Sequence, residues 1–224
     1  VVLLYIDNKL SYTNNYLVYA AYGAIMHRTV TGLVFAALLA ACGGIPLSSM
    51  PRLMGLQTAL LDADPAEFAL AIQADARMAP RPGSTPFLQV SIRPAEAGAF
   101  APVDKDLPLH LAATSASVHG LAAPTADRRW FIYSFPPESR AELARIQRHF
   151  KGIQAERRGK SGGSVSVGIR QDGVAPTDPA LADTRWESWL QISRREGYFE
   201  LWSGTVAALL EQADAARAKK AATN

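Results

Sequence analysis

The sequence predicts an α+β fold that is mainly β: an antiparallel sheet or β-sandwich of about seven short strands, with one inserted amphipathic helix and a C-terminal helix. Several short segments alternate apolar and polar residues with the period of two that is typical of half-buried strands. Only two longer segments repeat apolar residues at steps of three and four, as an amphipathic helix does. There is neither an internal repeat nor a regular helix–strand alternation, so nothing demands a parallel sheet.

The strands are predicted in chain order from these patterns. Alternation marks four half-buried strands, at residues 68–72, 88–92, 107–111 and 165–169. Residues 130–135 are nearly all apolar, which predicts a strand buried on both faces. Two further strands flank Arg194-Arg195-Glu196-Gly197, which predicts a hairpin turn.

Two helices are predicted among the strands. Pro136 and Pro137 open the first, and Glu138 lies in its first turn. Its apolar stripe recurs at helical spacing and consists of Leu143, Ile146, Phe150 and Ile153. The second helix is predicted over residues 205–218, with a frayed basic tail at 219–224.

Composition excludes several classes of protein. The chain has 23 Lys and Arg against 20 Asp and Glu, and a net charge of +3 is too small to indicate nucleic-acid binding. The hydrophobic fraction of 49% is enough for a packed core. The single cysteine, Cys42, excludes an internal disulfide and a cysteine-based zinc site, and no cofactor is indicated.

The segment before Cys42 has the layout of a secretory signal peptide. A short basic region at Met26-His27-Arg28 precedes an apolar run at residues 33–41, which is too short to span a bilayer comfortably. The run ends in Leu39-Ala40-Ala41-Cys42, which resembles the lipobox of bacterial lipoproteins at all four positions. The alternative is a free cysteine buried in a hydrophobic helix.

The resemblance implies that Cys42 is acylated and that the signal peptide is cleaved between Ala41 and Cys42. Acyl chains would anchor the protein to the lipid bilayer, in the cell envelope. Gly43 follows the cysteine, and in a Gram-negative cell this resembles the class sorted to the outer membrane, facing the periplasm. The resemblance covers only residues 26–42, and the domain behind it resembles no family that we recognise.

The chain divides into five segments on this interpretation. Residues 1–25 hold five of the seven tyrosines but no arginine or proline, and we interpret them as upstream sequence read as protein. A membrane hairpin formed with the following apolar run is the alternative. Residues 26–41 are the signal peptide, 42–64 a lipid-anchored linker leading into the domain, 65–218 a single β-rich domain, and 219–224 the basic tail.

No motif in the sequence assigns catalytic or metal-binding residues. Gly159-Lys160-Ser161 lacks the spacing of a phosphate-binding P-loop and follows a predicted helix instead of a strand. His110, His119 and His149 have no partner at metal-ligand spacing, so no metal site is predicted. A hydrolase site assembled from distant residues stays open as an alternative.

Two groups of residues are candidates for binding. The predicted helix from Glu138 to Lys160 is rich in cations that either contact anionic lipid headgroups or form an ordinary solvated face. These candidate cations are Arg140, Arg145, Arg148, Lys151, Arg157 and Arg158. Trp186, Trp189 and Trp202 are close in sequence, and they either fill the core or bind a sugar or lipid in a groove.

The functional hypothesis is therefore a membrane-anchored envelope lipoprotein with a non-enzymatic binding or structural role. The first alternative is a membrane-tethered hydrolase, in which a Ser or Asp would lie beside His110 or His119. The second is a sugar- or lipid-binding module, which requires the indoles of the tryptophan group to be partly exposed.

Overall fold

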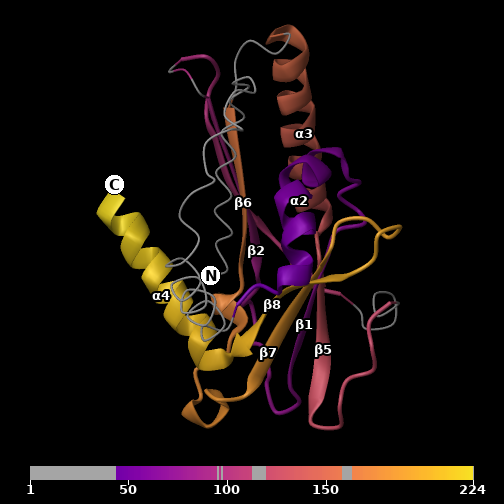
Figure 1. The fold of residues 1–224 in the computed structure, drawn as a ribbon, viewed down its shortest axis with the longest axis vertical. Helices are drawn as coiled ribbons and strands as arrows, with labels where there is room; N and C mark the ends of the chain where they lie inside the picture. The colour runs from indigo at the N-terminus through magenta and orange to yellow at the C-terminus, as the bar shows by residue number, and fades with distance from the viewer. Residues whose placement is uncertain (1–43, 95, 97, 113–119, 158–162, 224) are drawn as a thin grey trace, which may run out of the picture.

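The computed structural model describes residues 44–94, 96, 98–112, 120–157 and 163–223 (Figure 1). Eight strands within these residues form two antiparallel sheets, which confirms the mainly β, α+β class with a C-terminal helix. The five-stranded sheet has the order β4-β5-β1-β7-β8, and the three-stranded sheet has the order β3-β2-β6. The strands are β1 (Ala69–Asp75), β2 (Phe87–Pro94), β3 (Val103–Pro108), β4 (His110–Leu111), β5 (Arg128–Ser134), β6 (Gly163–Arg170), β7 (Arg185–Gln191) and β8 (Phe199–Thr205).

The helices lie beside and between these sheets. Figure 1 shows α3 rising alongside the three-stranded sheet, with α2 in front of the sheets and α4 at one side. Residues of both sheets join α2, α3 and the start of α4 in one continuous apolar core. The helices are η1 (Leu47–Ser49), α2 (Met50–Asp62), α3 (Pro137–Arg157), η2 (Asp172–Val174), η3 (Pro179–Leu181) and α4 (Val206–Thr223).

Two strands have the predicted half-buried alternation. In β2 the apolar side chains at 88, 90 and 92 are buried, and the residues between them are partly exposed. In β6 the side chains at 165, 167 and 169 are buried in the same way. The two strands pair antiparallel over residues 87–94 and 163–170, so their apolar faces line the same side of the sheet.

The central strand β1 differs from its prediction as a half-buried strand. It pairs with β5 on one side and β7 on the other, and every residue from Ala69 to Ala74 is buried. Ala71 pairs with Ile132 and Trp189, whose larger side chains lie on either side of it. The residues on the second face of β1 are mostly small and alternate with larger apolar residues. This pattern resembles that of a half-buried strand, so burial of the second face was not predicted.

The single strand predicted at residues 107–111 is divided between the two sheets. Leu107 belongs to β3 in the three-stranded sheet, and Leu111 belongs to β4 in the five-stranded sheet. Leu109 lies between them, is fully buried, and donates its backbone N–H to the Pro86 carbonyl at 2.9 Å. The chain therefore crosses from one sheet to the other here, and Leu111 becomes exposed instead of continuing the buried face.

The other predicted elements are found at nearly the expected positions. β5 is buried from Trp130 to Tyr133, as expected for a strand covered on both faces. β7 and β8 pair as the predicted hairpin, whose turn contains Gly197 at φ 69°, a conformation that glycine adopts easily. The C-terminal helix α4 continues to Thr223, so the helix extends through most of the predicted frayed tail.

Helix α2 replaces most of the linker predicted at residues 42–64. Pro51 occupies the first turn, where proline fits a helix, and Leu53, Leu56 and Leu60 are buried at helical spacing. Pro46, Pro51 and Pro65 had favoured an irregular segment over a helix. The segment is therefore part of the folded domain from Met50 onward.

A buried glutamine on α3 holds the end of α2. The Gln147 side-chain amide donates to the carbonyls of Leu60 and Ala63, at 2.7 and 2.9 Å. These carbonyls belong to the last turn of α2, where intrahelical partners are lacking. At the other end of α3, the Ser139 hydroxyl donates to the Pro108 carbonyl at 2.9 Å, next to the crossing between the sheets.

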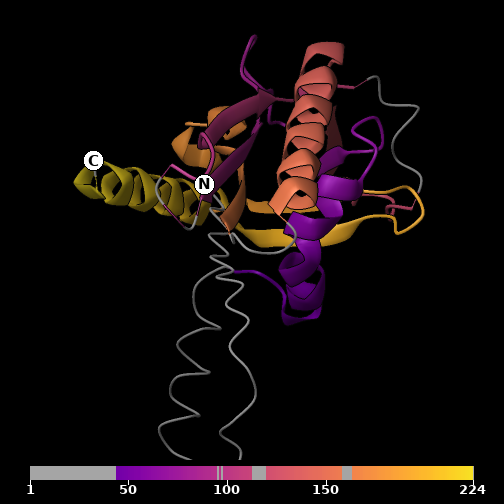
Figure 2. The same ribbon diagram turned by 90° about the horizontal axis from the view of Figure 1, so that it is seen from above.

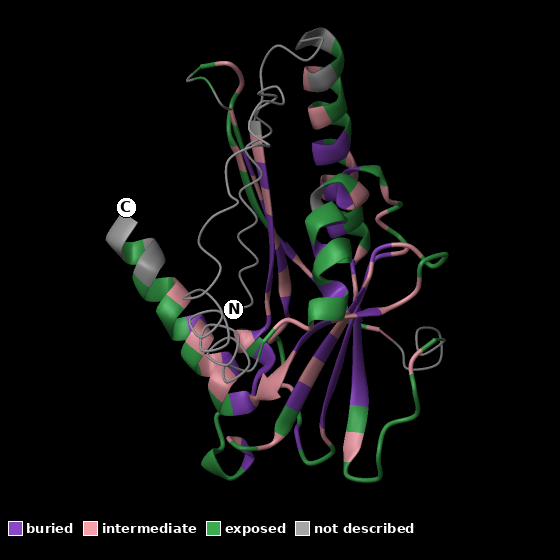
Figure 3. Cartoon of the chain, viewed as in Figure 1, coloured by how far each residue is buried: buried purple, intermediate pink, exposed green. Residues whose placement is uncertain are grey.

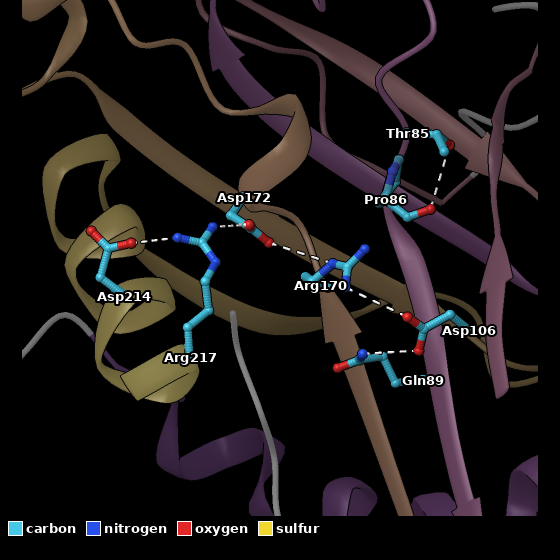
Figure 4. A network of polar contacts seen from close by, with 8 residues as sticks. All are labelled: Thr85, Pro86, Gln89, Asp106, Arg170, Asp172, Asp214 and Arg217. Atoms are coloured by element: carbon cyan, nitrogen blue, oxygen red, sulfur yellow. Dashed lines mark hydrogen bonds and ion pairs between the residues drawn. The ribbon is translucent and has the colours of Figure 1, made fainter. Parts of the chain in front are cut away.

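A chain of polar contacts fastens α4 to the three-stranded sheet (Figure 4). Arg217 on α4 pairs with Asp172 of η2, and it also pairs with Asp214 one turn earlier. Arg170 of β6 lies 3.9 Å from Asp172 and 3.5 Å from Asp106 of β3. Asp172 holds the pKa of Arg217 above its ordinary value through their hydrogen bond. Asp172 of η2 thus holds the C-terminal helix, and Arg170 connects Asp172 to the three-stranded sheet.

Replacing Gln147 with alanine should destabilise the fold by about 1–3 kcal/mol, because two buried carbonyls lose their donor. The matched control is Arg148→Ala on the exposed side of α3, which should stay within about 0.5 kcal/mol of the parent. Urea unfolding of both variants measures the difference. Equal stability of the two variants would show that the Gln147 hydrogen bonds do not hold α2 in place.

Candidate functional site

The predicted anchor residue Cys42 and the cleavage position after Ala41 lie outside the described residues. The described chain begins two residues later, at Gly44, and leads through η1 into α2. This start of the fold is therefore the described surface that is nearest to Cys42 in sequence.

Three large apolar side chains at this start are exposed. Leu47 on η1 and Met50 and Met54 on α2 have exposed fractions of 88%, 43% and 67%. Steps of three and four residues place them on one side of the helical segment, and the buried Leu53 and Leu56 lie on the adjoining side. In Figure 2 the start of α2 projects away from the sheets, and in Figure 3 its outward side is largely exposed. We call Leu47, Met50 and Met54 the N-terminal apolar surface.

This surface carries little charge. Arg52 is the only charged residue from position 44 to position 61. Its guanidinium lies 5.5 Å from the ring centroid of Phe199 on β8, which is cation–π geometry. Asp62 ends the helix, and its carboxylate is 2.9 Å from the Lys151 ammonium of α3. Acidic groups are thus absent from the first three turns of this segment.

Two of the three candidate tryptophans are core residues. Trp186 and Trp202 are at most 1% exposed, so these two fill the core and lack the partial exposure that the sugar- or lipid-binding alternative requires. The Trp186 indole donates to the Gln171 side-chain oxygen at 3.0 Å, and the Gln171 amide donates to Ser188. The Trp202 ring lies over Gly204, where an added Cβ would come within 2.6 Å of the indole. Their burial follows from the strand register, which places both rings on the core side.

Trp189 lies on the other face of the five-stranded sheet. It is partly exposed and meets Trp130 edge to face, with ring centroids 6.5 Å apart. Tyr198 packs against the same group, which we call the outer aromatic cluster: Trp130, Trp189 and Tyr198. The Trp130 indole donates to the Ala122 carbonyl at 2.9 Å. The Trp189 indole N–H is buried and has no hydrogen-bond partner among the described residues.

An ion pair borders the outer aromatic cluster. Gln73 of β1 pairs in register with Trp130 on one side and Glu187 on the other. Arg128 lies 3.3 Å from Glu187 and donates to the Gln73 carbonyl at 2.9 Å. Arg185 also pairs with Glu187. The outer face of this sheet therefore places aromatic rings next to a charged pair with little exposure.

The candidate cations of α3 are partly engaged by neighbours. Arg145 pairs with Glu142 at 2.7 Å, and Arg140 donates to the Phe135 carbonyl at the same distance. Lys151 pairs with Asp62, as described above, whereas Arg148 is exposed. The side chain of Arg157 and all of Arg158 lie outside the described part of the chain. The described cations are therefore less available to a lipid headgroup than their number suggests.

The two described histidines lie on exposed surfaces of different elements. His110 is on β4 and His149 is on α3, while His119 is outside the described residues. Neither described imidazole forms a hydrogen bond with another described residue. No three His, Cys, Asp or Glu side chains gather as metal ligands in the described ranges. No helix in the same ranges has the length and hydrophobicity needed to cross a bilayer.

Two carboxylates and two phenols have the largest pKa shifts among the described acidic groups, and the pKa of Asp127 is lowered as well, chiefly by its hydrogen bond from Thr125. Hydrogen bonding to Arg145, with a further contribution from Lys105, lowers the pKa of Glu142 to about 2. Hydrogen bonds from Arg77 lower the pKa of Asp75 to about 2. Burial raises the pKa of Tyr133 to about 12 in the core, and that of Tyr198 to about 12 in the outer aromatic cluster.

No family model, curated protein or solved structure matches this chain. The candidate surfaces therefore stand on their own geometry. The N-terminal apolar surface was not predicted from the sequence, because residues 42–64 were interpreted as a linker. The spacing of the leucines at 53, 56 and 60 was the available signal. Trp130 was also missed as the neighbour of Trp189, since the two are distant in sequence.

Both phenols should remain neutral well above the ordinary tyrosine pKa. Tyr133 and Tyr198 are the only tyrosines after residue 41, so a chain beginning at Cys42 reports on them alone. Near-ultraviolet phenolate absorbance should rise only as the pH approaches about 12, and in urea it should rise near the unperturbed value of about 10. The unfolded chain thus loses its protons first, so stability is full below pH 10 and falls as the pH rises towards 12.

Tyr133→Phe and Tyr198→Phe separate the two contributions to this titration. Each variant should remove about half of the absorbance change and leave the other half at high pH. A phenolate signal that appears in the folded protein at the ordinary tyrosine pKa would show that these rings are solvated.

Proposed function

We propose that this protein is a lipid-anchored protein of the bacterial cell envelope, with a non-enzymatic binding or structural role. The observation that carries the proposal is the sequence Leu39-Ala40-Ala41-Cys42 after the apolar run at residues 33–41, which resembles a lipobox. In a Gram-negative cell the proposed location is the outer membrane, on its periplasmic side.

The position of the fold relative to Cys42 supports a role close to the membrane. Only residues 43–46 separate Cys42 from η1, which is the first described helix. An extended chain spans about 3.3–3.6 Å per residue, so these residues place Leu47 at most about 18 Å from the cysteine. The domain would thus be held against the bilayer, with no long stalk between them.

The buried polar side chains of the described chain form hydrogen bonds that connect elements of the fold, which supports a binding or structural role. Gln147, Gln171 and Ser139 hold elements together through hydrogen bonds inside the fold. The hydrolase alternative requires a nucleophile next to a positioned base. His110 and His149 lie on exposed surfaces of separate elements, and this arrangement favours the binding role.

The outer aromatic cluster supports a second candidate function, the binding of a sugar. Trp189 is partly exposed, and its indole N–H lacks a described partner. The Arg128–Glu187 pair lies on the same face, beside Gln73. Aromatic faces combined with a few charged or amide groups are the usual composition of carbohydrate sites. This candidate uses Trp189 and not the two buried tryptophans.

Mass spectrometry of the protein purified from membranes tests the anchor. With the full chain expressed in a Gram-negative host, the N-terminal residue should be Cys42 carrying diacylglyceryl and acyl groups. Cys42→Ser should abolish the added mass, leave the signal peptide uncleaved, and release the domain once that peptide is removed by an engineered protease site. The control Ser48→Ala, at an exposed residue of η1, should be acylated like the parent. An unmodified thiol with residues 33–41 still attached would overturn the proposal.

Titration with soluble chito- and malto-oligosaccharides tests the second candidate. Ligand binding should change the tryptophan fluorescence, and Trp189→Ala should weaken the affinity at least ten-fold, which corresponds to about 1.4 kcal/mol. Met54→Ala, at an exposed site on α2, should bind like the parent. Unchanged fluorescence across the saccharide panel, or equal affinities of the two variants, would remove Trp189 from consideration as a sugar-binding residue.

A further inference from the structure

The described structure leaves four large apolar side chains exposed, and three of them form the N-terminal apolar surface. The fourth, Leu111, lies on β4, at the opposite edge of the five-stranded sheet from β8. Exposed apolar residues are ordinary when they are scattered over a surface. The concentration of three on one side of one helical segment indicates that this side meets an apolar partner.

The fold prevents this surface from turning inward. Leu53, Leu56 and Leu60 occupy the core on the adjoining side of α2. Gln147 holds the carbonyl end of the helix through its two hydrogen bonds, and Arg52 rests on Phe199 near the start. Rotating α2 to bury the exposed side chains would expose the three leucines, so the outward orientation is fixed.

The short chain between Cys42 and Leu47, and the lack of acidic residues before Asp62, indicate a lipid bilayer as the partner. If Cys42 is acylated, Leu47 is at most about 18 Å from the sulfur's backbone position, which is less than the roughly 30 Å thickness of a bilayer's hydrocarbon core. No acidic residue precedes Asp62 in the described chain, and Arg52 is a cation. Apolar side chains on a segment without acidic groups suit the boundary between anionic headgroups and acyl chains.

We propose that the N-terminal apolar surface lies in the headgroup–acyl boundary of the same bilayer that holds Cys42. Leu47, Met50 and Met54 enter the boundary. This inference rests on the proposed lipid anchor and adds to it a second, non-covalent contact. The acyl chains on Cys42 already supply stable attachment, so the second contact acts on the orientation of the domain.

Docking through this surface gives the domain one orientation on the membrane. Because η1 lies against β8, the β8 edge of the five-stranded sheet faces the bilayer. The β4 edge, with Leu111, then faces away from it. The domain is thus held at a fixed angle, instead of turning freely on a tether.

Site-directed labelling of the acylated protein tests this orientation. Acylation caps the only native thiol, so a cysteine introduced into the full chain is the one site available to an environment-sensitive fluorophore. The probes are Leu47→Cys, Met50→Cys and Met54→Cys, and the matched control is Leu111→Cys, another exposed apolar residue. Each labelled protein is reconstituted into vesicles of phosphatidylethanolamine and phosphatidylglycerol, with and without spin-labelled lipid.

Spin-labelled lipid should quench the three probes at least about three-fold more strongly than the probe at position 111, and their emission should shift to shorter wavelength. Quenching equal to that at position 111, in protein whose mass shows acylated Cys42, would overturn the docking and leave the anchor intact. A blue shift without lipid quenching would also overturn it, because a protein would then cover the surface. Absence of acylation in the mass spectrum would overturn the anchor and the docking together.

Discussion

A single apolar core shared by the two sheets is the constraint on which the rest of the structure depends. The three-stranded sheet contributes the buried side chains of β2 and β6, and the five-stranded sheet contributes those of β1, β5 and β7. Neither sheet is closed on itself, so α2 and α3 must cover the remaining apolar surface. Because Leu53, Leu56 and Leu60 point into this core, Leu47 and Met54 lie on the surface, where they contact solvent or a partner. The candidate docking surface is therefore a direct result of how the core is closed.

The same constraint explains where buried polar groups occur. The chain passes between the sheets after β1, β3, β5 and β6, and a crossing chain has backbone and side-chain polar groups away from strand pairing. At the crossing after β6, Gln171 is fully buried, and it accepts from Trp186 and donates to Ser188. At the crossing after β3, Ser139 donates to Pro108. These two crossings are thus stabilised by side chains whose hydrogen bonds are satisfied inside the protein.

Sequence patterns predicted the elements whose two faces differ in polarity. β2, β6 and α3 were found for this reason, since their buried residues alternate with polar ones. α2 was missed because the prolines at 46, 51 and 65 indicated a linker, although three leucines have helical spacing. Residues 107–111 were predicted as a single strand because Leu109 continues the apolar alternation there. The sequence pattern does not show that the chain changes sheets at this residue. Trp186 and Trp189 are three apart on one strand, which places them on opposite faces, but only the register showed which face is the core.

The edge strand β3 has a consequence for crowding at a membrane. Its exposed residues Asp104, Lys105 and Asp106 sit on the open side of the three-stranded sheet, where another copy's strand is able to add. If two copies paired antiparallel about Lys105, that residue would face itself and Asp104 would face Asp106, so every opposing pair would be of like sign. With the proposed lipid anchor, molecules concentrated in two dimensions would repel one another at this edge, which disfavours polymerisation by edge-to-edge strand pairing.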